Sequence, residues 1–174
     1  MNMNLLQKLA RHQKRLEGMP LGRKIYYVAN VLVGETYRKR GLGPLGPRLV
    51  EITVTNRCQC RCVHCYNETA PPVDDASELT RGEIARICKD AARIGFAEVN
   101  FTGGEPLLRK DIVALVKLAR SAGMLPKMNT NGILLTDDMA SRLKEAGLAW
   151  CAVSIDSSEP AVHDRLRGFD GCFK

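Results

Sequence analysis

From Leu49 to the end of the chain, segments with a strand pattern alternate with segments with a helix pattern, and this alternation restricts the fold most strongly. Apolar and polar residues alternate or β-branched residues cluster over 50–55, 98–101, about 125–129 and 149–155, which predicts four strands. Apolar residues at helical spacing follow each predicted strand. Such an order favours right-handed crossovers and a parallel sheet. We therefore predict an α/β fold of about four βα units.

Local signals mark where the predicted helices begin and end. Thr80 and Glu83 form a capping box, in which the side chain of each residue is placed to satisfy a free backbone N–H group. Thr136 is a second N-terminal cap, and a further helix is predicted from Pro160. Three glycines each predict the end of a helix: Gly95, Gly123 and Gly147.

Each predicted strand is followed by a short group of polar or reactive residues. In parallel α/β sheets, ligand-binding residues gather at the carboxyl ends of the strands. We therefore expect the four groups to meet at one edge of the sheet and to form the functional site. They are the cysteine-rich loop after 50–55, Gly103-Gly-Glu-Pro106, Asn129-Thr-Asn-Gly132 and Ser154-Ile-Asp156.

The cysteine-rich loop has the composition of a metal site. Four of the seven cysteines lie between residues 58 and 65, whereas a disulfide scaffold would spread its cysteines along the chain. Cys58, Cys62 and Cys65 form a C-x3-C-x2-C motif that can direct three thiolates to one inorganic centre. In a cubane cluster of four irons, three thiolates leave one iron without a protein ligand, as in catalytic metal sites. The spacing therefore favours an iron–sulfur centre.

Two alternatives stay open for this loop. A structural zinc site usually has four ligands, and His64 could be the fourth, although its place beside Cys65 is sterically unfavourable. Cys60 offers a C-x-C pairing and hence a second register. We predict that Cys60 is not a ligand, because its use would break the C-x3-C-x2-C spacing. The isolated Cys88 and Cys151 are expected to lie in the core.

The run Cys58-Gln-Cys-Arg-Cys62-Val-His-Cys65-Tyr66, followed by Gly103-Gly-Glu-Pro106, resembles the radical S-adenosylmethionine (SAM) superfamily. The resemblance extends from about Leu49 to Lys174. It implies a partial, TIM-like (βα) barrel with a [4Fe–4S] cluster bound by Cys58, Cys62 and Cys65, and SAM at the open iron. It further implies that the reduced cluster cleaves SAM to methionine and a 5′-deoxyadenosyl radical, which abstracts hydrogen from a substrate.

The segment 103–106 is the first SAM-binding element that the resemblance implies. Gly103, Gly104, Glu105 and Pro106 would hold the amino group of the SAM methionine. The glycines allow a close backbone approach to a ligand, Glu105 offers a carboxylate or backbone acceptor, and Pro106 stiffens the turn. A plain βα turn would account for the two glycines but not for the whole combination.

Other strand-end residues receive SAM-binding roles from the same resemblance, and each has a structural alternative. Ser154 is similar to the family position that hydrogen-bonds the ribose, and the alternative is a strand-end hydroxyl. Asn129 and Thr130 would face the SAM site, and the alternative is a turn over the following Asn-Gly pair. Tyr66 would lie against the adenine. Arg167 could meet the SAM carboxylate, but a solvated arginine is the favoured interpretation.

The chain divides into a basic N-terminal part and the core. Residues 1–47 are predicted to be a basic helical extension that ends in the Gly/Pro-rich linker 41–47, and residues 48–174 are predicted to be the radical SAM core. Residues 1–50 contain ten Lys and Arg residues and two acidic residues, whereas the remainder contains 16 basic and 17 acidic residues. We interpret this zone as a solvated helical face; a nucleic-acid or membrane-surface arm is the alternative.

Composition restricts location and partners. Aromatic residues are 5% of the chain, so there is no strong signal for stacking on nucleic acids. The N-terminus does not have the pattern of a signal peptide, and the longest apolar-rich stretch is far shorter than the ~20 residues that span a bilayer. We expect a cytoplasmic protein, in which peripheral membrane contact by the basic N-terminus is a minor alternative.

The resemblance also sets expectations for the reaction. The family barrel has six βα units and four are predicted here, so we expect an incomplete barrel that lacks the units that usually select the substrate. The motifs look most like enzymes that modify peptides or build cofactors, so the expected substrate is a peptide or a cofactor precursor. An external electron donor such as flavodoxin or ferredoxin is implied, and no catalytic residue is assigned. The alternative function is a non-catalytic iron–sulfur or zinc module that binds a partner, or an inactive fragment of the enzyme.

Overall fold

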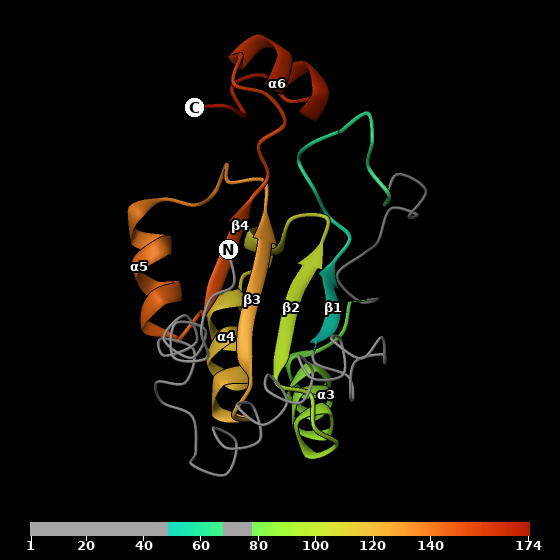
Figure 1. The fold of residues 1–174 in the computed structure, drawn as a ribbon, viewed down its shortest axis with the longest axis vertical. Helices are drawn as coiled ribbons and strands as arrows, with labels where there is room; N and C mark the ends of the chain where they lie inside the picture. The colour runs from blue at the N-terminus through green and yellow to red at the C-terminus, as the bar shows by residue number, and fades with distance from the viewer. Residues whose placement is uncertain (1–48, 68–77) are drawn as a thin grey trace, which may run out of the picture.

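The computed structural model describes residues 49–67 and 78–174, drawn in colour in Figure 1. Within these ranges, four parallel strands form one sheet in the order β1-β2-β3-β4, so every neighbouring pair is joined by a crossover. The predicted α/β fold with four βα units is confirmed. The extension and linker predicted for 1–47 lie outside the described residues. The strands are β1 (Leu49–Thr55), β2 (Glu98–Gly103), β3 (Leu125–Thr130) and β4 (Trp150–Val153); the helices are α3 (Arg81–Arg93), η2 (Pro106–Leu108), α4 (Ile112–Ser121), α5 (Asp137–Glu145) and α6 (Pro160–Arg167).

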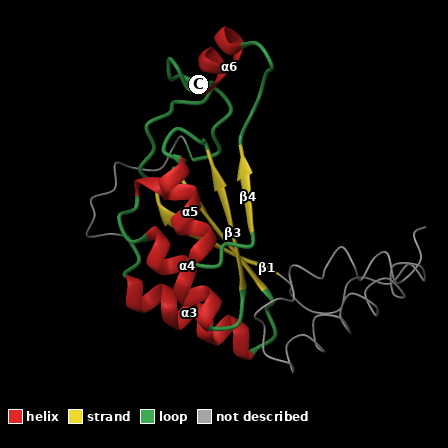
Figure 2. Ribbon diagram, turned by 90° about the vertical axis from the view of Figure 1, so that its left-hand side faces the viewer, coloured by secondary structure: helices red, strands yellow, loops and turns green. Residues whose placement is uncertain are grey.

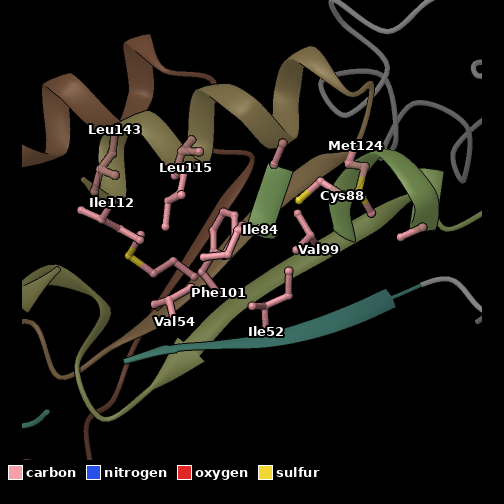
Figure 3. Close-up of a cluster of buried hydrophobic side chains, with 14 of the residues drawn as sticks. Ile52, Val54, Ile84, Cys88, Val99, Phe101, Ile112, Leu115, Met124 and Leu143 are labelled. Atoms are coloured by element: carbon pink, nitrogen blue, oxygen red, sulfur yellow. The ribbon is translucent and has the colours of Figure 1, made fainter. Parts of the chain in front are cut away.

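Helices α3, α4 and α5 lie against one face of the sheet, and the core lies between the two layers (Figure 2). Because strand side chains alternate between faces, Ile52, Val54, Val99 and Phe101 all point from β1 and β2 toward the helices (Figure 3). Cys88 packs among them and is fully buried, as predicted. The second cysteine expected in the core, at position 151, is only half-buried and is not part of this cluster.

The local helix signals are confirmed in detail. Thr80 Oγ1 accepts from Glu83 N at 3.2 Å, and Glu83 Oε2 accepts from Thr80 N at 2.8 Å, which is the predicted capping box. Thr136 Oγ1 accepts from Met139 N at 3.2 Å. Some features differ from the prediction. The short helix η2, which begins at Pro106, is not predicted. Strand β2 extends to Gly103 rather than ending at Phe101, and β4 ends at Val153 rather than at Ile155.

The last helix is placed differently from the others. Helix α6 lies beyond the carboxyl ends of the strands rather than against a face of the sheet (Figures 1 and 2). Its end pairs with the cysteine-rich loop, because Arg61 N donates to Arg167 O at 2.9 Å and Val63 N donates to Leu166 O at 3.0 Å. The carboxyl edge of the sheet is therefore enclosed between the loop and α6. Among the described residues, no helix has the length and apolarity needed to cross a membrane.

Candidate functional site

A cavity of about 940 Å³ lies at the carboxyl edge of the sheet, where the four strand-end groups meet. The expectation that these groups meet at one edge of the sheet is therefore confirmed, and their role as a functional site stays a prediction. Glu105 and Pro106 are the two predicted site residues that do not line the cavity. The predicted site residues that line it are Cys58, Cys62, Cys65, Tyr66, Gly103, Gly104, Asn129, Ser154 and Arg167.

The cysteine-rich loop leaves β1 and folds over this cavity. Arg61 Nη1 donates to the carbonyls of Cys58 and Cys60 at 3.0 Å each, and Cys65 N donates to Cys62 O at 3.1 Å. These bonds hold the loop in a compact turn. The Cys58, Cys62 and Cys65 thiols are free and only partly buried, whereas Cys60 is 5% exposed.

Two polar side chains donate to the sulfurs of the loop. Asn131 Nδ2 lies 3.9 Å from Cys58 Sγ and 3.5 Å from Cys60 Sγ. Arg167 Nη1 lies 3.5 Å from Cys62 Sγ. Sulfur accepts hydrogen bonds best as a thiolate, which is also the form that binds metal. The site therefore offers donors to two of the three motif cysteines.

Burial acts against ionisation in this loop. It raises the pKa of the Cys58 thiol, and the nearby Glu105 carboxylate acts in the same direction. The pKa of Cys60 is raised further, first by burial and then by the neighbouring Cys172 and Cys58 thiols. Coordination to a metal deprotonates a thiol outright, so a bound centre would reverse this penalty at the cysteines that it contacts.

The segment 103–106 is joined to the entrance of the cysteine-rich loop. Gly104 N donates to Thr55 O, and Glu105 N donates to Arg57 O, both at 2.8 Å. A Cβ at Gly103 would lie 2.0 Å from Thr55 O, and one at Gly104 would lie 2.3 Å from Arg57 O. The two glycines are thus required by the approach of the chain to its own backbone, in addition to any approach to a ligand.

The Glu105 carboxylate is fully buried behind the cavity and has three protein donors. Its Oε1 accepts from Leu107 N at 2.9 Å and from Thr130 Oγ1 at 2.7 Å, and its Oε2 accepts from Asn131 N at 2.7 Å. Glu105 thereby fixes the backbone of Asn131, whose side chain donates to Cys58. A direct contact between Glu105 and the amino group of SAM stays a prediction.

Substitution of Glu105 by Gln is expected to lower the free energy of unfolding by about 1–3 kcal/mol. If the Gln oxygen takes the place of Oε1, its amide nitrogen faces the N–H group of Asn131 and leaves that donor unsatisfied. A protonated carboxyl group could still accept at both oxygens. Urea unfolding of the metal-free chain below pH 4.5, where the carboxyl group is protonated, measures the loss. An unchanged free energy of unfolding at that pH would contradict this account.

The same substitution has an expected pH dependence. Burial is the main cause that raises the pKa of Glu105 above its ordinary value of 4.5, so the folded chain binds this proton more tightly than the unfolded chain. Ionisation of Glu105 therefore lowers stability as pH rises from 4.5 through the folded pKa. Glu105→Gln removes this component. Its deficit relative to the natural chain should be largest below pH 4.5 and should shrink as pH rises.

Arg167 is buried at the end of α6 and is 8% exposed, so the favoured interpretation of a solvated arginine is wrong. Its Nε lies 2.9 Å from Asp156 Oδ2, and its Nη1 points to the Cys62 sulfur. The same oxygen of Asp156 also lies 3.7 Å from His64 Nε2. His64 is therefore paired with a carboxylate rather than with the cysteines.

The remaining predicted residues lie along the cavity wall. Ser154 N donates to Thr130 O at 2.9 Å, which continues the β3–β4 pairing beyond the strand and places Ser154 on the cavity. The Tyr66 hydroxyl lies 3.4 Å from Thr102 Oγ1, while the residue as a whole is 77% exposed. Asn129, on β3, also lines the cavity. Their roles toward SAM stay predictions.

Asn131 is the main site residue that the sequence did not single out. It was assigned to a possible turn, and its Oδ1 does accept from Ile133 N at 3.0 Å, as in such a turn. Its Nδ2, however, donates to the cysteine sulfurs. The sequence signal that could have identified Asn131 is its position directly after a predicted strand. The other groups of residues that form the site occupy the same kind of position.

Comparison with known proteins identifies the family. A family model described as the Radical SAM superfamily matches residues 52–173. The chain belongs to this superfamily. Radical SAM proteins are enzymes that use a [4Fe–4S] cluster and SAM, so the predicted family and cofactors are confirmed.

Curated relatives share the matched region. The chain is 39% identical over 120 residues to Fe-coproporphyrin III synthase of Methanosarcina barkeri, covering 69% of this chain and 30% of the relative. It is 37% identical over 128 residues to PqqA peptide cyclase of Rhodopseudomonas palustris, covering 72% of this chain and 33% of the relative. The chain thus spans about a third of the length of these relatives.

Solved structures show the same fold. SuiB of Streptococcus suis bound to its precursor peptide SuiA superposes with a TM-score of 0.63 at 19% identity, covering 82% of this chain and 32% of that chain. BtrN in complex with AdoMet and 2-DOIA superposes with a TM-score of 0.58 at 23% identity, covering 66% of this chain and 48% of that chain. These likenesses confirm the predicted α/β fold of the radical SAM type.

The donor set of this radical SAM site fits the family's cluster. Within the described ranges, no three Cys, His, Asp or Glu side chains converge on one point where a single ion could bind. A tetranuclear cluster does not require this convergence, because each thiolate binds a different iron. The three partly exposed thiols border the cavity together with Arg57, Arg61 and Arg167. These cations suit a centre whose three thiolates make it anionic.

Replacement of Cys60 by Ser is expected to leave most of the iron bound to this radical SAM chain. Cys60 is buried between Asn131 and Cys172, and its thiol is less exposed than those of the motif cysteines. Anaerobic reconstitution followed by iron analysis measures the effect. If Cys60→Ser loses as much iron as Cys62→Ser, the assigned register of the ligands is wrong.

Proposed function

We propose that this chain is the cluster- and SAM-binding part of a radical SAM enzyme that modifies a peptide or a cofactor precursor. When bound and reduced, the cluster supplies the electron that cleaves SAM to methionine and a 5′-deoxyadenosyl radical, which abstracts hydrogen from the substrate. The observation that carries the proposal is the cavity in which Cys58, Cys62 and Cys65 face the ends of all four strands.

Each part of the cavity wall has a proposed task. Cys58, Cys62 and Cys65 ligate three irons and leave the fourth open to SAM. The backbone of Gly103 and Gly104 is held on the cysteine-rich loop and lines the cavity, and we propose that it faces the amino group of SAM. Asn129, Ser154 and Tyr66 are proposed to contact its adenosine part, and Arg167 is proposed to contact its carboxylate. Glu105 and Pro106, which do not line the cavity, are proposed to act on SAM through the position of the 103–106 segment.

Two substrate classes follow from the relatives. One relative is named as a peptide cyclase, and another as an Fe-coproporphyrin III synthase. The structural neighbour SuiB was solved with a precursor peptide. We propose that this chain serves a reaction of one of these kinds, in the cytoplasm, with an external donor such as flavodoxin or ferredoxin. Residues 1–47 are proposed to be an extension separate from the core of 48–174.

The proposal is tested by SAM cleavage. The chain is reconstituted anaerobically with iron and sulfide, reduced with dithionite and incubated with SAM, and 5′-deoxyadenosine is measured. We expect slow formation without a coupled substrate, because β4 is the edge of the described sheet and Trp150 and Val153 on it are exposed. Cys58→Ala/Cys62→Ala/Cys65→Ala is the matched control and should form none.

The same experiment separates the enzyme from the alternative function. A chain that binds the cluster but gives no more 5′-deoxyadenosine than the triple variant would be a non-catalytic iron–sulfur module. A chain that binds stoichiometric zinc without sulfide would be a zinc module. Either result would contradict the proposed function.

A further inference from the structure

Arg167 is a buried cation directed at a cysteine of the proposed cluster site. A buried charge is costly unless it is paired and hydrogen-bonded. Arg167 has both kinds of partner: Asp156 Oδ2 lies 2.9 Å from Nε, and Cys62 Sγ lies 3.5 Å from Nη1. The guanidinium is therefore positioned between a carboxylate and a cysteine that is expected to be a thiolate.

The backbone fixes this position from both sides of Cys62. Arg61 N donates to Arg167 O, and Val63 N donates to Leu166 O, so the two segments are tied to each other on either side of the cysteine. The next residue, Gly168, lies so near that a Cβ there would be 2.4 Å from Arg61 O. The end of α6 cannot move away from the loop without breaking these contacts.

Asp156 is itself held in place. Its backbone N donates to Nδ1 of His163, a buried side chain of α6, at 3.2 Å. Its carboxylate lies between Arg167 and His64, which precedes Cys65. The Asp156 charge offsets much of the Arg167 charge at long range. The local N–H donation to the sulfur then becomes the main effect of Arg167 on the site.

We propose that Arg167 raises the reduction potential of the cluster by donating a hydrogen bond to the Cys62 thiolate, and that Asp156 holds it in this geometry. This inference rests on the proposed function, since it requires the cluster. A hydrogen bond to a ligating sulfur withdraws electron density from the iron and stabilises the extra negative charge of the reduced state. Arg167 is a positioning residue in this role, distinct from any contact with the SAM carboxylate.

The test is an EPR-monitored redox titration of the reconstituted chain without SAM. Arg167→Gln is expected to lower the ratio of reduced to oxidised cluster at a fixed potential about tenfold, which is a midpoint shift of about −59 mV for a one-electron couple. Arg167→Lys, which keeps the charge but not the planar fork, should lower the ratio about threefold. The matched control is Arg165→Gln, because Arg165 is exposed on the same helix and carries the same charge.

The outcomes distinguish this role from the others. Equal midpoints for Arg167→Gln and the natural chain would overturn the proposal and would restrict Arg167 to SAM binding or to structure. An equal shift in Arg165→Gln would show a general charge effect and would also overturn it. If Arg167→Gln takes up no cluster, an unchanged midpoint in Arg167→Lys overturns it. Failure of the natural chain to take up iron and sulfide would instead contradict the proposed function itself.

Discussion

Replacing Cys58, Cys62 or Cys65 with Ala is expected to abolish stable assembly of the iron–sulfur cluster in this chain. The three thiols lie on one loop and border one cavity, and each is proposed to bind a different iron. Within the proposed ligand set, loss of one leaves two thiolates for four irons, with no spare cysteine assigned to replace it. Anaerobic reconstitution of the natural chain should give broad visible absorbance with nearly equal iron and sulfide, and each variant should lose both.

Cys88→Ala and Cys151→Ala are the matched controls. Cys88 is buried beneath the sheet, and Cys151 is half-buried on β4. Neither borders the cavity, so both variants should keep the cluster if they fold. Assembly that survives in Cys58→Ala, Cys62→Ala and Cys65→Ala alike would show that the centre lies elsewhere.

Local patterns in the sequence were sufficient to predict the scaffold. The capping box at Thr80 and Glu83 depends on residues only three positions apart, and the alternation of strands depends on windows of a few residues. Topology then follows, because βαβ connections have one hand and bring the carboxyl ends of parallel strands to one edge. Because of this topology, the motif cysteines, the two glycines, Asn129 and Ser154 are expected at one edge of the sheet, and in the structure they line one cavity.

Contacts between distant segments were not predictable in the same way. Arg167 ends an amphipathic helix, and a cation in the last turn of a helix is usually solvated. Its burial depends on Asp156 and on Cys62, which is 105 positions away. The Glu105 carboxylate likewise needs Thr130 and Asn131, which approach it only through the pairing of β2 with β3. Residue type gives no information about such partners.

The glycines of the 103–106 segment show how an accurate motif can have an incomplete explanation. From the sequence, we expect that the glycines allow a ligand to come close to the backbone. In the structure they also allow the backbone of Thr55 and Arg57 to come close, so they set the position of the cysteine-rich loop relative to β2. The residue types in such a motif are restricted both by the ligand and by the neighbouring loop. Only the restriction by the ligand could be inferred from the family resemblance.

Substitution of Gly103 by Ala should therefore be among the most damaging changes of a single residue. Gly103 has a φ of +135°, which residues other than glycine rarely adopt. The Cβ of an alanine at this position would lie 2.0 Å from Thr55 O. Backbone strain costs about 1–3 kcal/mol and overpacking costs a further 1–3 kcal/mol, so we expect a loss of roughly 2–6 kcal/mol. Urea unfolding of the metal-free chain measures this loss, and reconstitution measures whether the displaced loop still assembles a cluster.

Gly171→Ala separates the two causes. Gly171 also has a positive φ, of +84°, but a Cβ there would meet nothing within 4 Å. This variant should therefore show only the strain, about 1–2 kcal/mol, and should keep the cluster. The loss of stability in Gly103→Ala beyond that in Gly171→Ala then comes mainly from the clash of the new Cβ with the Thr55 carbonyl. If Gly103→Ala is no less stable than Gly171→Ala, the cysteine-rich loop moves to accommodate the new methyl group at little cost. In that case the contact between β2 and Thr55 does not hold the three thiols over the cavity.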